Sequence, residues 1–407
     1  MKLSTLFCLI LISTNAFGNN FYLGKESTSW GVQVSSMENS KFSLKLGTRL
    51  QTITNFSSQQ DNLSDSKKKY FDSSIRRSRL QVEAKYKEGI KLYMDIRNDN
   101  INEDDRGEGD FNLGDGYIEV KNIFSIDGLN FRAFRAKVHV SRSETVSSSK
   151  ILIPNRAYIA DEAAQFISHN RRASNIQLLG NHDKLSYQVV LGDGIHKSKF
   201  YDSIGSSLSS GSIDRQSLMY GGKIRINPFS NWINTKKVET YFGEGKHFSL
   251  GAGFFSIPKI EYQNSSGSQV DDLSRSLLNL DVTFHYKNLS IQSEFFKFDG
   301  VVKDFNANQK TVGKSDGFYL HGEYVLDNFY YISPFFRIES WDKFKDEDNY
   351  DLNSQILGVN WYLKGNQIRV GLMYQRDSFE SEVYESNGRG EVFDKVEHLK
   401  LYSMWHY

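Results

Sequence analysis

The chain has 407 residues, of which 39% are hydrophobic, 24% charged and 14% aromatic, with four prolines and one cysteine. After the first twenty residues, no stretch approaches the roughly 20 apolar residues of a membrane-spanning helix, which argues against a helical membrane protein. The formal net charge of +1 gives no support to a nucleic-acid-binding protein, because such proteins usually carry a strong basic excess.

Residues 1–18 are predicted to be a secretory signal peptide. Lys2 supplies a positive start, residues 3–12 form a short apolar stretch, and Ala16-Phe17-Gly18 fits the small-x-small cleavage pattern. Cys8 lies inside this segment, so the mature chain is expected to contain no disulfide and no thiolate metal site. We expect 19–40 to be a short periplasmic segment and 41–407 to form one transmembrane domain.

Alternation of apolar and polar residues dominates the rest of the chain and predicts β-strands. In the first strand, Phe42, Leu44 and Leu46 lie on one face, while Lys45 and Arg49 lie on the other. About sixteen such strands of roughly ten residues follow one another, the length of a tilted strand that spans a bilayer. They are predicted at 42–51, 77–86, 90–97, 117–120, 134–140, 176–178, 185–191, 218–226, 248–254, 278–286, 289–295, 318–324, 330–338, 357–363, 368–374 and 399–407.

Two features favour a membrane barrel over a soluble β-sandwich. Short turns such as Lys87-Glu88-Gly89 and Lys287-Asn288 alternate with long polar connections, as in barrels with short periplasmic turns and longer extracellular loops. One face of each strand is apolar and the other carries charges, and about sixteen strands enclose an interior too wide for side chains to fill. We therefore expect the apolar face to contact lipid and the charged face to line water. The long connections are predicted at 59–69, 98–110, 194–216, 258–275, 299–315 and 376–396.

The predicted fold is thus an all-β, antiparallel transmembrane barrel of the bacterial outer membrane. The final strand carries Leu399, Leu401 and Trp405 in phase with Tyr407. This pattern resembles the C-terminal signal by which outer-membrane barrels are recognised for assembly. We therefore expect the barrel-assembly machinery and outer-membrane lipid as partners.

Four segments resemble the phosphate-selective porin O and P family. Residues 42–51 (Phe-Ser-Leu-Lys-Leu-Gly-Thr-Arg-Leu-Gln) are similar to its opening strand, and Phe71-Asp72 with 75–80 (Ile-Arg-Arg-Ser-Arg-Leu) to its second strand. Residues 114–120 (Gly-Asp-Gly-Tyr-Ile-Glu-Val) and 130–138 (Asn-Phe-Arg-Ala-Phe-Arg-Ala-Lys-Val) resemble its fourth and fifth strands. The resemblance is most specific between residues 31 and 195.

The resemblance implies a sixteen-stranded, trimeric outer-membrane porin for passive diffusion of small hydrophilic solutes. It also implies a constriction loop that folds inward after the fifth strand, here at about 141–172. The family's usual Gly and Pro near the end of the fifth strand are absent, since 136–140 read Ala-Lys-Val-His-Val.

Inward positions, assigned by alternation, carry roughly twice as many bases as acids, and rings of Arg and Lys in a pore favour anions. Arg suits phosphate in particular because its planar fork donates to two oxygens together. The predicted channel therefore prefers anions, with phosphate as the candidate. The near-zero net charge of the mature chain and the acidic loops favour the alternative of unselective or weakly anion-selective diffusion. The anion pathway is predicted along Arg49, Arg77, Arg79, Lys91, Arg97, Arg135 and Lys137, and the basic residues of the constriction loop are Arg142, Lys150, Arg156, Arg171 and Arg172.

Two other classes of function are weighed. An outer-membrane barrel enzyme of the protease or phospholipase type is one, since His285, His321, His398 and His406 lie in or beside predicted strands. The other is an adhesin or structural barrel that displays its loops. The sequence contains no His-Glu-x-x-His, no P-loop and no Gly-x-Ser-x-Gly motif, so we expect no enzyme, no cofactor and no metal site.

Overall fold

A computed structural model describes the fold. It describes residues 32–35, 42–60, 67–87, 89–101, 111–195, 212–229, 239–240, 242, 246–263, 269–306, 309–345, 351–380, 385–386 and 392–407. The predicted signal peptide and most of 19–40 lie outside these residues. None of the helices in these ranges has the length and apolar content needed to cross a membrane.

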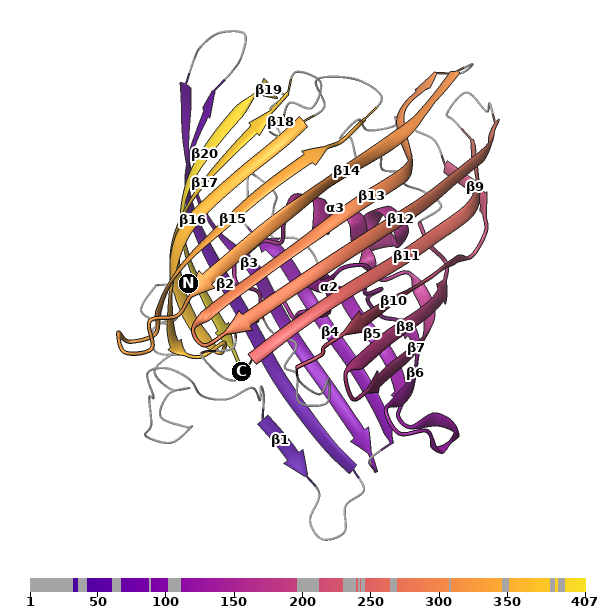
Figure 1. The fold of residues 1–407 in the computed structure, drawn as a ribbon, viewed down its shortest axis with the longest axis horizontal. Coiled ribbons are helices and arrows are strands. Elements are labelled where there is room, and N and C mark those ends of the chain that lie inside the picture. Colours follow the sequence, from indigo (N-terminus) through magenta and orange to yellow (C-terminus); the bar gives the residue numbers. More distant parts are fainter. Residues whose placement is uncertain are drawn as a thin grey trace.

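Sixteen antiparallel strands form one closed barrel, as the alternation predicts (Figure 1). Each strand pairs with the next, and the last strand pairs with the first over Arg49↔His406 to Gln60↔Lys395, so this ladder closes the ring. The strands are β2 (Phe42–Gln60), β3 (Lys67–Tyr86), β4 (Ile90–Ile101), β5 (Asn112–Val120), β6 (Leu129–Arg135), β7 (Ser174–His182), β8 (Leu185–Gly192), β10 (Met219–Ile226), β11 (Lys246–Gln263), β12 (Gln269–Tyr286), β13 (Leu289–Asn306), β14 (Gln309–Tyr324), β15 (Ile332–Asp342), β16 (Asp351–Lys364), β17 (Ile368–Phe379) and β20 (Lys395–His406).

Four short strands accompany this ring. β1 (Val32–Ser35) pairs with the part of β2 that lies before its ladder with β20. β9 (Ser212–Gln216) precedes β10 and pairs with the far end of β11, and β18 (Glu385–Ser386) pairs with β19 (Val392–Phe393). The described helices are η1 (Ile123–Ser125), α2 (Arg142–Thr145), α3 (Tyr158–Ile167) and η2 (His169–Arg171).

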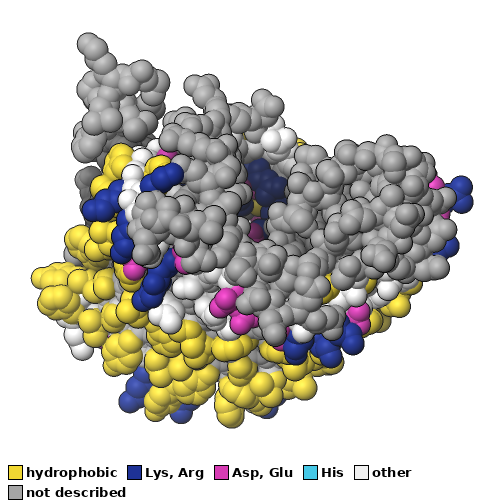
Figure 2. All heavy atoms as spheres, turned by 90° about the horizontal axis from the view of Figure 1, so that it is seen from above, with side chains coloured by type: hydrophobic (Ala, Val, Ile, Leu, Met, Phe, Trp, Pro, Cys, Tyr) yellow, Lys and Arg dark blue, Asp and Glu magenta, His cyan; other side chains and the backbone are white. Residues whose placement is uncertain are grey.

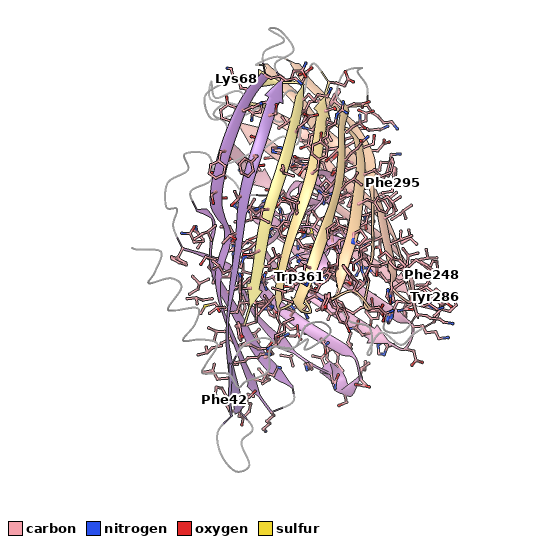
Figure 3. The ribbon with its side chains drawn as sticks, turned by 90° about the vertical axis from the view of Figure 1, so that its left-hand side faces the viewer. Phe42, Lys68, Phe248, Tyr286, Phe295 and Trp361 are labelled. Carbon is pink, nitrogen blue, oxygen red and sulfur yellow. The ribbon has the colours of Figure 1, made fainter. Side chains whose placement is uncertain are left out.

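The outer surface of the wall is apolar, as predicted. Leu357 is 64% exposed and Leu401 is 50% exposed, while the intervening residues of their strands face inward and are buried. Figure 2 shows the resulting layer of hydrophobic side chains over the outside of the barrel. Aromatic side chains such as Phe42, Phe248 and Tyr286 lie toward one end of the wall, and Lys68 lies at the opposite end (Figure 3).

Two predicted loops are wrong for most of their length. The segments predicted as loops at 258–275 and 299–315 are largely strand, because the hairpins β11–β12 and β13–β14 stay paired almost to their tips. Of the predicted loop 59–69, residues 59–60 and 67–69 are strand, and the rest lies outside the described residues. The β13–β14 ladder, for example, reaches Asn306↔Gln309. Apolar alternation marks only the part of a strand that meets lipid, whereas backbone hydrogen bonds continue beyond it through polar residues.

The fifth strand is shorter than predicted. β6 ends at Arg135 and not at Val140, and the backbone of Phe134 has a φ of 85°, a conformation that side chains other than glycine rarely adopt. Ala136, Val138 and Val140 are completely buried. The apolar alternation at 134–140 therefore reflects burial beside the inner wall and does not reflect contact with lipid.

The expectation that the inner face lines water is wrong for one part of the wall. Phe255, Phe296, Phe298 and Trp341 face inward from β11, β13 and β15, and each is at most 4% exposed. They form the main hydrophobic core together with residues of α3. This part of the inner face is apolar because it is covered by protein and not by water.

The lipid-facing parity of the closing strand can be tested with Leu401→Arg. We expect this substitution to lower the free energy of unfolding by about 2–4 kcal/mol, because a cation then faces the bilayer midplane. Denaturant titration of the barrel in lipid vesicles measures this change. Leu401→Ala is the control and should cost less, and an equal effect of both substitutions would place Leu401 away from lipid.

Candidate functional site

The segment between β6 and β7 lies against the inner face of the wall. It contains α2, α3 and η2, which Figure 1 shows among the barrel strands. Among the described residues, its hydrogen bonds reach eleven of the sixteen strands of the ring, namely β2, β3, β5, β7, β8, β10, β12, β13, β15, β16 and β17. We call residues 136–173 the inner segment.

Helix α3 attaches this segment through apolar contacts. Ile159, Ala163 and Phe166 are at most 1% exposed and belong to the same core as the inward aromatics of β11–β15. The ring of Phe166 meets that of Phe298 edge to face at 5.2 Å between centroids. The guanidinium of Arg275 lies 4.4 Å from the Phe166 ring and donates to the Phe166 carbonyl. Burial of this helix face stabilises the inner segment on the side of the barrel that β11–β15 form.

Buried wall side chains also bond to the backbone of the segment. The carboxylate of Glu294 accepts hydrogen bonds from the N–H groups of Arg142 (2.7 Å) and Ser143 (2.9 Å). Glu339 accepts from the N–H of Ile159 at 2.7 Å, and Arg369 donates to the carbonyl of Ile151 at 2.7 Å. Charged partners make these bonds stronger than neutral ones, so the path of the backbone is fixed.

Arginines of β2 and β3 hold the segment from the other side. Arg49 donates to the hydroxyls of Ser148 (2.6 Å) and Ser147 (3.0 Å), and Arg77 donates to the carbonyl of Pro154 at 2.8 Å. Arg49 is only 4% exposed. Arg49 and Arg77 therefore position the inner segment, and Arg49 does not reach the main cavity described below.

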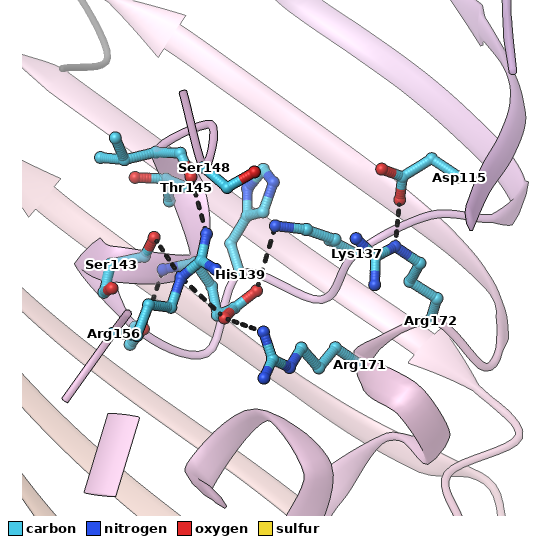
Figure 4. Close-up of polar contacts among 12 residues, drawn as sticks. Asp115, Lys137, His139, Ser143, Thr145, Ser148, Arg156, Arg171 and Arg172 are labelled. Atoms are coloured by element: carbon cyan, nitrogen blue, oxygen red, sulfur yellow. Dashed lines mark hydrogen bonds and ion pairs between the residues drawn. The ribbon is translucent and has the colours of Figure 1, made fainter. Parts of the chain in front are cut away.

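Glu144 of α2 is the centre of an ion cluster within the inner segment. Figure 4 shows the three bases of this cluster, Lys137, Arg156 and Arg171. The carboxylate of Glu144 lies 3.1 Å from Arg156, 3.4 Å from Lys137 and 3.4 Å from Arg171. Burial alone would raise the pKa of Glu144, but these three cations outweigh burial and hold the pKa well below its usual range. The carboxylate therefore stays ionised at acidic pH. Its stabilising effect is lost only as the pH falls through the lowered pKa of the folded state.

A cavity of about 1110 Å³ lies between the inner segment and β3–β6. It is lined by nine basic side chains but only two acidic ones, Asp99 and Asp161. In the view from above, Lys and Arg side chains lie in the hollow at the centre of the molecule (Figure 2). The basic side chains are Arg76, Arg77, Arg79, Arg97, Arg135, Lys137, Arg156, Arg171 and Arg172. We call this space the basic cavity.

The bases of this cavity differ in their partners. Arg79 forms an ion pair with Asp99 at 2.5 Å, and Arg172 forms one with Asp115 at 2.8 Å. Within the described residues, Arg135 donates only to the carbonyls of Leu113 and Gly114. Arg97 makes no hydrogen bond or ion pair within them and is attracted by Asp95 and Asp99 only from a distance. Arg97 and Arg135 therefore present the cationic groups that are most available to a solute.

The remaining predicted site residues lie elsewhere. Lys91 and Arg142 line a second, smaller cavity of about 180 Å³. There Lys91 is paired with Glu119 at 3.0 Å, and Glu119 also binds Arg132 at 2.6 Å. Lys150 lies in the inner segment, where its carbonyl accepts a hydrogen bond from the N–H of Glu239. The structure thus brings eight of the twelve predicted bases into the basic cavity.

Arg76 lines the cavity although alternation assigns it to the outer face. The β2–β3 register passes from Gln51↔Arg77 to Thr52↔Ile75, so Arg76 has no partner on β2 in that ladder. This bulge turns Arg76 inward beside Arg77, and its Nε donates to Asn155 at 3.0 Å. The sequence contains little signal for this bulge, because Arg76 lies in a run of four polar residues, 76–79, in which alternation is lost.

The family description "phosphate-selective porin O and P" matches residues 45–382. The chain belongs to this family. It is an outer-membrane porin, a channel-forming barrel of the bacterial outer membrane, as the sequence predicts. A search of curated proteins found no match.

Solved porin structures share the fold of this porin at low sequence identity. An anion-selective porin from Comamonas acidovorans has a TM-score of 0.61 at 13% identity, covering 90% of this chain and 100% of that chain. The outer-membrane channel DcaP of Acinetobacter baumannii has a TM-score of 0.59 at 9% identity, covering 92% and 99%. OmpT of Vibrio cholerae, in a trimer form, has a TM-score of 0.54 at 11% identity, covering 90% and 100%.

The ion cluster of this porin can be tested with Glu144→Gln. We expect a loss of about 3–5 kcal/mol of stability in the inner segment, because buried cations lose their common counter-charge. Faster amide hydrogen exchange at 141–172 is the measurement. Asp161→Asn is the control, because Asp161 is 38% exposed and its ion pair with Arg171 should contribute less than about 1 kcal/mol. Unchanged exchange in Glu144→Gln would show that the apolar face of α3 suffices.

Proposed function

We propose that this porin conducts small hydrophilic anions and that the basic cavity sets its selectivity. The observation that supports this most directly is the excess of nine bases over two acids around one water-accessible space. A solute anion that enters this space gains attraction from several cations, whereas a cation is repelled. In this proposal the inner segment is the constriction loop, since it fills the side of the lumen opposite β3–β6.

The size and chemistry of the cavity support hydrated oxyanions as solutes. A volume of about 1110 Å³ holds a small anion together with many water molecules, so complete dehydration is not needed for passage. Arg97 and Arg135 can donate to oxyanions through their planar guanidinium groups. Paired bases such as Arg79 add to the local potential but have one side occupied by a carboxylate.

We also propose that the channel is not an enzyme and that it assembles as a homotrimer. Among the described residues, His285 and Ser290 form a pair that resembles a catalytic one, at 2.9 Å, but the two residues are only 2% and 6% exposed in adjacent wall strands. A substrate carbonyl has no path to that hydroxyl. Trimer formation is supported by the trimeric form of the similar Vibrio cholerae barrel.

Selectivity is tested by the double variant Arg97→Gln/Arg135→Gln. A cation about 7 Å from a solute anion contributes about 0.6 kcal/mol even at the dielectric constant of water, a factor of about 3 in occupancy. We therefore expect the anion-to-cation permeability ratio to fall about three- to tenfold at low salt. The reversal potential across a planar bilayer in a salt gradient measures this ratio.

Lys45→Gln/Lys85→Gln is the matched control for charge. It removes the same number of bases from β2 and β3 near their turn end, where Lys85 is 45% exposed and paired with Glu83. This control should leave the permeability ratio close to that of the wild type. If both double variants shift the reversal potential equally, selectivity depends on the total charge of the lumen and not on the basic cavity.

Phosphate preference is tested separately from anion preference. Addition of phosphate at constant chloride should reduce the chloride current of the wild type, because a more strongly held oxyanion occupies the basic cavity for longer. Arg97→Gln/Arg135→Gln should lose this block. A wild-type chloride current that is insensitive to phosphate would support general anion diffusion instead.

A further inference from the structure

The outer face of β17, β20, β2 and β3 carries three successive rows of cross-strand neighbours. The row nearest the middle of the wall is entirely apolar or aromatic: Tyr374, Leu399, Phe56 and Phe71. Phe56 and Phe71 are 52% and 64% exposed, and their rings lie 4.9 Å apart. This row has the composition of an interfacial aromatic belt.

The two rows beyond this belt carry basic side chains. The first row is Arg376, Glu397, Ser58 and Lys69, and the second is Ser378, Lys395, Gln60 and Lys67. Four bases are thus opposed by one acid, Glu397, whose carboxylate also accepts a hydrogen bond from the Tyr374 hydroxyl at 3.0 Å. Adjacent strands are about 4.8 Å apart, so Lys67 and Lys395 are separated by about 10 Å across the sheet. We call these four bases the basic rim.

The strands β13 and β14, which β15 and β16 separate from the basic rim, have a different charge pattern. On β13 and β14 the aromatic pair Phe295↔Phe318 is followed by Lys297↔Asp316 and then by Asp299↔Lys314. Each base there faces an acid, and Asp316 also forms an ion pair with Lys345. The excess of positive charge in the basic rim is therefore a local feature and not a general property of the strand ends.

We propose that the basic rim binds the phosphorylated headgroup of an outer-leaflet glycolipid. The rim lies at the end of the wall that bears the long connections, which in such barrels is the extracellular end. Acyl chains would contact the aromatic row, while phosphate groups lie level with the two rows above it. Lys and Arg keep their stems along apolar surface and extend their charged groups to this level. Anionic lipid headgroups are the partner that such a sequence of rows fits.

Native mass spectrometry of the full-length porin with bis-phosphorylated lipid A tests this proposal. The variant Lys67→Gln/Lys69→Gln/Arg376→Gln/Lys395→Gln should bind the lipid at least about tenfold more weakly than the wild type, because each base attracts the headgroup. Lys297→Gln/Lys314→Gln is the control on β13 and β14 and should bind within about twofold of the wild type. Wild-type protein should also bind dephosphorylated lipid A much more weakly.

Three results would overturn the proposal. The first is equal binding of lipid A by the quadruple variant and the wild type. The second is equal binding of phosphorylated and dephosphorylated lipid A, which would leave only the aromatic row as the contact. The third is a changed oligomeric state of the quadruple variant with retained lipid binding, which would assign the basic rim to contacts between copies of the chain.

Two further measurements keep the experiment interpretable. If the quadruple variant does not assemble, Lys67→Gln/Lys69→Gln and Arg376→Gln/Lys395→Gln are compared separately, and each should weaken binding about threefold. Bilayer conductance of the same variants should be unchanged, because none of the four bases lines the basic cavity. Failure of lipid binding is therefore distinguishable from failure of the proposed anion selectivity.

Discussion

Every backbone N–H and C=O that enters the bilayer must find a partner within the protein, because lipid offers none. This constraint is met by the ladder between β2 and β20, which joins the two ends of the sheet over Arg49–Gln60. Closure fixes the inward and outward faces of all sixteen strands together. The outward face then has to be apolar, and the inward face is free to carry the charges and the folded segment that give the lumen its chemistry.

The inner segment divides the lumen into two unequal parts. Toward β11–β17, it is attached by apolar packing of α3, by backbone N–H groups that donate to Glu294 and Glu339, and by hydrogen bonds that Arg369 donates. Toward β3–β6, an arginine-rich wall faces open space. The position of the charges therefore depends on the apolar contacts across the barrel, because these contacts decide which side of the lumen stays open to water.

Much of this arrangement follows from the sequence. Alternation predicted the number of strands and the inward parity of Arg77, Arg79, Arg97 and Arg135, because a period of two assigns each residue to one face. It failed at Arg76, where a bulge shifts that period by one residue, and at Phe296 and Phe298, whose inward neighbour is a helix distant in sequence. Such contacts between distant segments leave no local pattern, so the partners of Arg49 and Glu294 were not predictable.

The wall is far from uniform in height, since β11 to β13 have 18 residues each but β6 has only seven. Seven residues rise about 23 Å along the strand, and a tilt of about 40° reduces this to about 18 Å along the bilayer normal. The apolar band of such barrels is about 25 Å tall. Around β6 the apolar wall is therefore shorter than the hydrocarbon layer. Such a mismatch is accommodated either by local thinning of the membrane or by contact of this flank with another protein surface in place of lipid.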